Sequence, residues 1–267
     1  MIKDITIGQY FPGNSIIHRL DPRMKIILTI LYIVMIFLSK SFLGFAVAAA
    51  LLLFVICLSK ISLRIILKSI KPLLFVIVFT AVFNIFYGDG PSLFPQISWL
   101  SWLTWNGLER AIFMAIRIIL LITGSSFVTY TTSPIMLADA IERLISPLKY
   151  FKVPVHEFSM MMTIAMRFIP TLIDETEKIM NAQKARGADF ETGNIIKRAK
   201  ALIPILIPLI VSSFRRAEEL ADAMECRCYN GGEHRTSYKV YSLSVCDFLA
   251  LAVILFSIAA VCLLSYL

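Results

Sequence analysis

Five apolar runs along the chain each approach the length of a membrane-spanning helix. Such a helix needs roughly 20 predominantly apolar residues to cross about 30 Å of hydrocarbon. The runs lie at residues 24–39, 42–58, 72–87, 108–130 and 243–264. Asp21 and Pro22 suit the start of the first run, because aspartate caps helix N-termini and proline fits the first helical position. The pattern predicts an all-α, polytopic integral membrane protein with about five transmembrane helices.

The long segment between the fourth and fifth runs differs from the rest of the chain. Residues 133–240 hold 15 of the 26 Lys and Arg residues and 13 of the 18 Asp and Glu residues. We therefore expect an N-terminal membrane region at 1–132, a cytosolic or interfacial insert at 133–240, and a closing transmembrane helix at 241–267. The insert also carries two apolar runs, FSMMMTIAMRFIP and ALIPILIPLIVSSF. We interpret them as halves of long amphipathic coupling helices against the inner membrane face; one more helical hairpin across the bilayer is the alternative.

Composition supports the membrane assignment and argues against nucleic acid as a partner. The 267 residues are 58% hydrophobic and 16% charged, whereas soluble domains carry about a quarter charged residues. The net charge of +8 fits cytosolic loops, where Lys and Arg accumulate opposite anionic lipid. Membrane lipid is thus an expected partner, and nucleic acid is not.

The distribution of basic residues predicts the orientation. Those that precede the first run or separate the second from the third are Lys3, Arg19, Arg23, Lys60, Arg64, Lys68 and Lys71. The last four follow one another at helical steps, which would place them on one helical face. The next connection has no Lys or Arg but carries Trp99, Trp102 and Trp105, as an interfacial aromatic belt would. We expect a multi-pass protein of the cytoplasmic membrane, with its N-terminus and insert cytosolic and its C-terminus outside.

Two helices of the insert are predicted to end on an arginine. Arg186 precedes Gly187, and glycine supplies the left-handed residue that commonly follows a helix end. Arg227 lies 41 residues later, so that AQKARG and AMECRC align with an alanine and an arginine in common. A cation in the last turn can simply stabilise the helix dipole. Alternatively, a guanidinium at a helix tip can pair with two carboxylate oxygens of a partner.

Three motifs together resemble one transporter family. The first is HRLDPRMK, with His18, Arg19, Asp21, Pro22, Arg23 and Lys25; the others are ARG at 185–187 and AMECRC at 223–228. With this layout of spans and insert, the chain resembles the transmembrane T component of energy-coupling factor transporters, a family that includes the cobalt/nickel permease Q proteins. The resemblance covers essentially the whole chain.

The resemblance implies a scaffold rather than an enzyme. In this family two ABC-type ATPase subunits each receive one arginine tip, and a small hydrophobic membrane subunit binds the vitamin or transition-metal ion to be imported. Carried over, the ATPase-docking residues are Ala185, Arg186, Gly187, Cys226, Arg227 and Cys228. The family usually repeats Ala-Arg-Gly at the second tip, so both cysteines depart from its pattern. With Cys228 in place of glycine, we expect the turn to come later, near Asn230 and Gly231.

Four further residues are candidates for contacts within the membrane or with the partner subunit. Arg117 lies inside the fourth run, where charges are costly and usually face a partner or a polar interior. It either contacts another helix of this chain or seats the membrane partner. Met160, Met161 and Met162 form an adaptable surface for changing partners, or they pack as ordinary apolar residues.

Catalytic and metal-binding signatures are weak, so neither a metal nor a cofactor is expected. No GxxxxGK[ST] phosphate loop is present, and His156-Glu157 lacks the second histidine of a zinc protease because Met160 takes its place. Cys226, Cys228 and His234 do not follow a usual structural-zinc spacing. Two rival functions remain, a substrate-translocating permease of a conventional ABC importer and an intramembrane enzyme. The first would need polar residues lining several spans, and the second a cluster of Asp, His or Glu.

Overall fold

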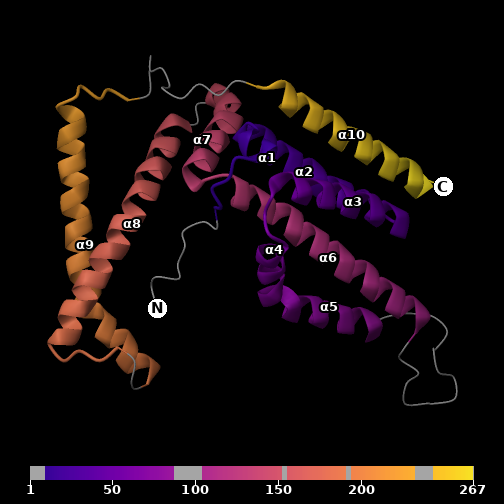
Figure 1. Ribbon diagram of the computed structural model, residues 1–267. Helices are drawn as coiled ribbons and strands as arrows, with labels where there is room; N and C mark the ends of the chain where they lie inside the picture. Colours follow the sequence, from indigo (N-terminus) through magenta and orange to yellow (C-terminus); the bar gives the residue numbers. More distant parts are fainter. Residues whose placement is uncertain (1–9, 87–103, 152–154, 191–193, 232–242, 267) are drawn as a thin grey trace. The chain divides into compact units, whose positions relative to one another are not determined.

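A computed structural model of the protein describes residues 10–86, 104–151, 155–190, 194–231 and 243–266, which form helices and no strand (Figure 1). The chain divides into two compact units. One, the membrane unit, comprises Gly8–Leu137 and Tyr241–Leu267, and the other, the insert unit, comprises Met1–Ile7 and Ala138–Val240. The all-α fold expected from the apolar runs is confirmed.

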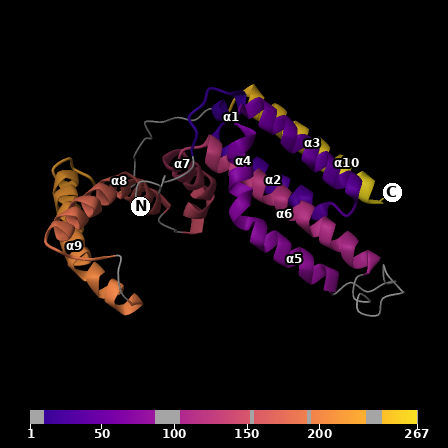
Figure 2. The same cartoon turned by 60° about the horizontal axis from the view of Figure 1, so that its bottom comes forward.

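The membrane unit is built from helices that pack lengthwise. Its elements are α1 (Ile16–Arg19), α2 (Pro22–Leu38), α3 (Phe42–Ser59), α4 (Leu63–Ile70), a 3₁₀ turn η2 (Lys71–Leu73), α5 (Leu74–Phe86), α6 (Trp105–Thr131), the first turn of α7 (Pro134–Ile145), and α10 (Val245–Tyr266). Helix α6 packs against α5, α2 and α3, and α10 packs against α2 and α3 (Figures 1 and 2). The first and last apolar runs are therefore neighbours.

The core of this unit lies where α2, α3 and α6 meet. Met35, Ile36 and Ala48 are fully buried there, and Phe127 of α6 joins the same cluster. Gly124 permits the close approach of α6 to α2, because a Cβ at this position would lie 2.2 Å from a ring carbon of Tyr32. A side chain at position 124 would therefore push these helices apart.

Four helical segments among the described residues are long and apolar enough to cross a membrane. They are Phe42–Ser59, Leu63–Phe86, Trp105–Thr131 and Val245–Leu264. The expected first span is α2, which has 17 residues and covers about 26 Å at 1.5 Å per residue. Because α2 is not among these four segments, a count of five spans stays a prediction. The third expected span, from residue 72, falls within the candidate segment Leu63–Phe86, in which α4, η2 and α5 follow one another directly.

The expectation that four basic residues share one helical face is wrong for Lys60. This residue ends α3 in a left-handed conformation, with φ of 58°, and so belongs to no helix together with Arg64 and Lys68. Trp99 and Trp102 lie outside the described residues, whereas Trp105 starts α6 and is exposed.

The insert unit is dominated by two helices of 31 residues each, α8 (Val155–Ala185) and α9 (Ile195–Glu225). The rest of α7 and the 3₁₀ segment η4 (Ser146–Phe151) precede them. Helices α8 and α9 contact and cross each other (Figure 1). As expected, each apolar run of the insert forms part of a long helix whose C-terminal half is polar.

Candidate functional site

The first arginine tip ends α8 with a closed backbone cap. Gly187 has φ of 89°, its N–H donates to the carbonyl of Lys184 at 2.9 Å, and the N–H of Ala188 donates to that of Gln183 at 3.0 Å. This pair of bonds is the Schellman motif, which satisfies carbonyls that a helix end leaves free. Arg186 is therefore the last side chain before the left-handed residue, as predicted.

The second tip repeats this cap at the 41-residue offset. The N–H of Cys228 donates to the carbonyl of Glu225 at 2.8 Å, and that of Tyr229 donates to Met224 at 3.0 Å. Cys228 itself adopts the left-handed conformation, with φ of 55°. The expectation of a later turn near Asn230 and Gly231 is wrong, because the two backbone bonds hold a cysteine where the first tip has glycine.

This substitution predicts a stability difference between the tips. A residue with a Cβ in the left-handed region is disfavoured by about 1 kcal/mol or slightly more relative to glycine. Cys228→Gly is therefore expected to stabilise the cap of α9 by about 1 kcal/mol, and Gly187→Ala to destabilise that of α8 by a similar amount. Amide hydrogen exchange in the last turn of each helix measures both changes; slower exchange in wild type than in Cys228→Gly would contradict the prediction.

Both arginine side chains are exposed and have no partner among the described residues. Their guanidinium groups form no hydrogen bond or ion pair there, and the thiols of Cys226 and Cys228 beside Arg227 are free and exposed. Two guanidinium groups are thus presented at helix ends without a hydrogen-bond or ion-pair partner in the described part of the chain. Small residues adjoin both arginines: Ala185 and Gly187 flank Arg186, and Cys226 and Cys228 flank Arg227.

A polar contact joins the two helices where they cross. Glu175 of α8 accepts a hydrogen bond from the Ser212 hydroxyl and forms an ion pair with Arg216 of α9 at 2.6 Å. Glu175 lies eleven residues before Arg186, and Arg216 lies eleven residues before Arg227. The crossing is therefore at the same distance along each helix from its arginine tip.

This contact predicts a pH dependence. The Ser212 hydrogen bond and the Arg216 charge together lower the pKa of Glu175 below its usual value. A carboxylate with a lowered pKa contributes stability above its unfolded pKa of about 4.3, and this contribution is lost as the pH falls through the folded value. Wild type should therefore melt above Glu175→Gln at pH 7, and the two melting temperatures should converge as the pH falls below the folded pKa of Glu175. The control is Glu177→Gln, since Glu177 forms no such contact among the described residues; equal melting of wild type and Glu175→Gln at pH 7 would contradict the prediction.

The HRLDPRMK motif forms a polar cluster at one end of the membrane unit. Asp21 caps α2 by accepting from the N–H of Arg23 and pairs with the Arg23 guanidinium at 2.9 Å, and Pro22 occupies the first helical position as predicted. His18 bridges Ser15 and the carbonyl of Phe11 through its two ring nitrogens, at 2.7 Å and 3.0 Å. Arg19 ends α1 and is exposed.

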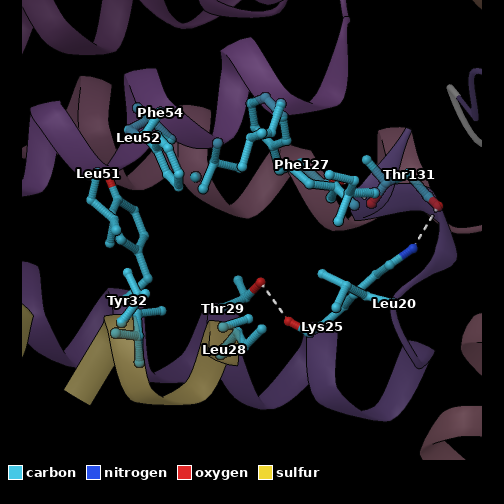
Figure 3. Close-up of a pocket in the computed structure, with 18 of the residues that line it drawn as sticks. Leu20, Lys25, Leu28, Thr29, Tyr32, Leu51, Leu52, Phe54, Phe127 and Thr131 are labelled. Carbon is cyan, nitrogen blue, oxygen red and sulfur yellow. Dashed lines mark hydrogen bonds between the residues drawn. The ribbon is translucent and has the colours of Figure 1, made fainter. Parts of the chain in front are cut away.

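Lys25 is buried and links three elements of the unit. Its ammonium donates to the carbonyl of Thr131 at 2.9 Å (Figure 3). It also donates to the Thr132 hydroxyl and to the carbonyl of His18, at 3.3 Å each. Because Thr131 is the last residue of α6, the cation lies at the negative end of that helix dipole. Lys25 thereby holds the end of α6 to α1 and to the start of α2.

Asp247, which is not among the residues predicted from the sequence, completes this cluster. Its carboxylate has no exposed surface, accepts from the N–H of Asp21 at 3.0 Å and from the N–H of Ser244 at 2.7 Å, and interacts electrostatically with Lys25. The signal was available, because Ser244 and Asp247 before an apolar run have the spacing of a capping box. We call Asp21, Lys25, Thr131 and Asp247 the polar clasp.

Comparison with known proteins shows the family of this chain. A family model described as cobalt transport protein, CbiQ, matches residues 13–238. The energy-coupling factor transporter transmembrane protein EcfT of Ruminiclostridium cellulolyticum is 51% identical over 268 residues, which cover 100% of this chain and 99% of that protein. The EcfT protein of Streptococcus equi subsp. equi is 45% identical over 262 residues, covering 98% and 97%. The chain belongs to the CbiQ/EcfT family of transporter membrane components.

Membership in the CbiQ/EcfT family fits a transport protein with several membrane helices. Arg117 lies in α6, one of the helices long and apolar enough to cross the membrane. Its guanidinium donates to the carbonyl of Ser39 at 3.2 Å. Its guanidinium carbon also lies 5.5 Å from the ring centroid of Phe45, within cation–π range. Arg117 thus contacts two neighbouring helix segments of this chain.

The residues considered for contact with the partner subunit or for metal binding in this CbiQ/EcfT family member include several on α8. Met160, Met161 and Met162 lie near its start, and Met161 is exposed. His156 contacts Glu142 of α7 at 3.4 Å, and Glu142 also accepts from the Ser159 hydroxyl at 2.6 Å. Within the described ranges no group of three His, Cys, Asp or Glu residues could hold a metal ion.

Proposed function

We infer that the protein is the transmembrane scaffold of an ATP-driven energy-coupling factor importer. In this proposal it links two ABC-type ATPase subunits, identical or different, to a small hydrophobic membrane subunit that binds a vitamin or a transition-metal ion. The observation that carries the proposal is the pair of matching caps, which present Arg186 and Arg227 without internal partners.

The chemistry of the tips suits docking into acidic grooves. A guanidinium pairs two carboxylate oxygens at once, and a desolvated pair of this kind loses about 3–5 kcal/mol when one partner is removed. Exposed ion pairs contribute less than about 1 kcal/mol and could not transmit force between subunits. Each tip, with its arginine at the helix end, would enter one ATPase groove, and Ala185, Gly187, Cys226 and Cys228 would line the contact.

The apolar surfaces of α8 and α9 suit the membrane subunit. Ile207, Val211 and Phe214 of α9 and Met161 of α8 are exposed, although a polar surface is normal for helices in water. We propose that this face supports the substrate-binding subunit, with Met160, Met161 and Met162 as its adaptable part. The N-terminus and the insert would be cytosolic, in the cytoplasmic membrane, as the basic residues predict.

Capture of the assembled transporter tests the function. The affinity-tagged full-length chain would be produced together with ABC ATPases and candidate substrate-binding subunits, and its complexes purified and weighed by native mass spectrometry. We expect two ATPase subunits and one small hydrophobic protein on each chain, and ATP-dependent uptake in proteoliposomes only when all are present. Uptake with the ATPases alone would instead favour a substrate-translocating permease.

A further inference from the structure

An apolar cavity of about 410 Å³ opens in the membrane unit between α1, α2, α3, α6 and α10 (Figure 3). The polar groups along it are mostly occupied within the protein. The hydroxyls of Thr29 and Thr131 donate to backbone carbonyls of Lys25 and Phe127 at 2.8 Å each, and the Lys25 ammonium belongs to the polar clasp. Apart from the hydroxyl of Tyr32, the cavity therefore presents a hydrocarbon surface to any occupant.

The rim of the cavity is apolar and exposed, whereas its wall is buried. Phe54 of α3 and Leu249 of α10 lie at the rim, 55% and 61% exposed, on helices long and apolar enough to span a membrane. Leu52 and Phe127 line the wall and are buried. In a multi-pass membrane protein such a rim meets lipid, and only a chain that enters the cavity reaches the wall.

An exposed cation lies in the chain next to residues that line one end of the cavity. Ile16 and Leu20 line the cavity, and Arg19, which lies between them outside the lining, is exposed and its guanidinium has no partner among the described residues. A cation at this position complements a phosphate group, as basic residues near a membrane surface attract anionic lipid.

We propose that this cavity binds one acyl chain of an anionic phospholipid, whose phosphate group contacts Arg19. The chain fills the space between α2, α3, α6 and α10, next to the polar clasp. The site concerns the membrane unit alone and does not depend on ATPase docking.

Tyr32 provides an internal check on the chemistry of the occupant. It lines the cavity, its side chain is buried, and its hydroxyl has no hydrogen-bond partner within the described part of the chain. A hydrocarbon chain neither uses nor needs this donor, so Tyr32→Phe leaves binding unchanged. A ligand that carries an acceptor at this depth would bind Tyr32→Phe more weakly.

Photolabelling tests the proposal on the full-length chain in lipid nanodiscs. The probe is phosphatidylglycerol with a photoreactive diazirine near the end of one acyl chain, and labelled residues are mapped by mass spectrometry. Leu52 and Phe127 report entry into the cavity, and Phe256 of α10, which is 78% exposed, reports contact with bulk lipid. The filling variant is Ala250→Phe, and its matched control is Ala252→Phe, an exposed position of the same helix that does not line the cavity.

We expect label on Leu52 and Phe127 in wild type, Tyr32→Phe and Ala252→Phe, and its loss in Ala250→Phe with Phe256 still labelled. Replacing the probe with the phosphatidylcholine analogue, or Arg19 with Gln, should lower cavity labelling about five-fold. The proposal is overturned if Leu52 and Phe127 stay unlabelled, if Ala250→Phe labels like wild type, or if Tyr32→Phe loses the label. Equal labelling by both lipids would overturn the role of Arg19.

Discussion

Arg186→Ala and Arg227→Ala are each expected to weaken ATPase association by about 100-fold or more, which corresponds to the 3–5 kcal/mol lost when a desolvated charge pair loses one partner. Each variant should retain the ATPase bound at the intact tip, so that native mass spectrometry finds one ATPase on the scaffold in place of two. The double variant should capture none. Substitution by lysine should restore little, because an ammonium cannot reproduce the planar fork.

The structure separates this effect from a loss of folding. Neither guanidinium has a partner among the described residues, so both alanine variants should melt at the wild-type temperature. Arg215→Ala is the matched control, since Arg215 is an exposed arginine of α9 located away from the tip. Full ATPase capture and normal uptake by both single variants would refute the docking role.

The second large effect is expected at Asp247. Asp247→Ala removes a fully buried carboxylate and leaves the N–H groups of Asp21 and Ser244 without their acceptor and Lys25 with less opposing charge. Breaking a buried charge network from one side costs about 3–5 kcal/mol, which is a large part of the stability of most domains. We expect a marked drop in melting temperature and in the amount of protein in the membrane.

A double-mutant cycle distinguishes the clasp from simple helix capping. Lys25→Met and Asp247→Asn should each destabilise the unit, and their combination should cost less than the sum because neither charge then remains uncompensated. The control is Glu109→Gln, since Glu109 is an exposed carboxylate of α6 outside the polar clasp. Asp139→Asn does not serve, because Asp139 takes part in other contacts. Strictly additive effects would show that Lys25 and Asp247 do not act together.

Local sequence signals predicted those features that depend on a few adjacent residues. Asp21 and Pro22 start α2 because capping and a fixed φ are properties of single residues, and Gly187 ends α8 for the same reason. Cys228 and Lys60 were not predicted, because a left-handed residue with a side chain is locally unfavourable and is held by surrounding structure.

Contacts between distant segments could not be read from the sequence. Nothing near Lys25 indicates that its ammonium reaches Thr131, more than a hundred residues later, or that Asp247 lies beside the start of α2. The capping-box spacing of Ser244 and Asp247 predicts the local bond between them. The bond from the N–H of Asp21 to the other carboxylate oxygen of Asp247 depends on the packing of α10 against α2. The cavity likewise requires five segments to be placed together.

The equal spacing of Glu175 and Arg216 from the two tips has a mechanical consequence. The segment from Glu175 to Arg186 and the segment from Arg216 to Arg227 are each eleven residues long, or about 16 Å at 1.5 Å per residue. The contact at the crossing is therefore a pivot at the same distance from both tips. Equal pushes at both ends then produce balanced torques about that point. Two ATPase subunits that move symmetrically would therefore change the crossing angle between α8 and α9, and would not rotate the pair of helices as a whole.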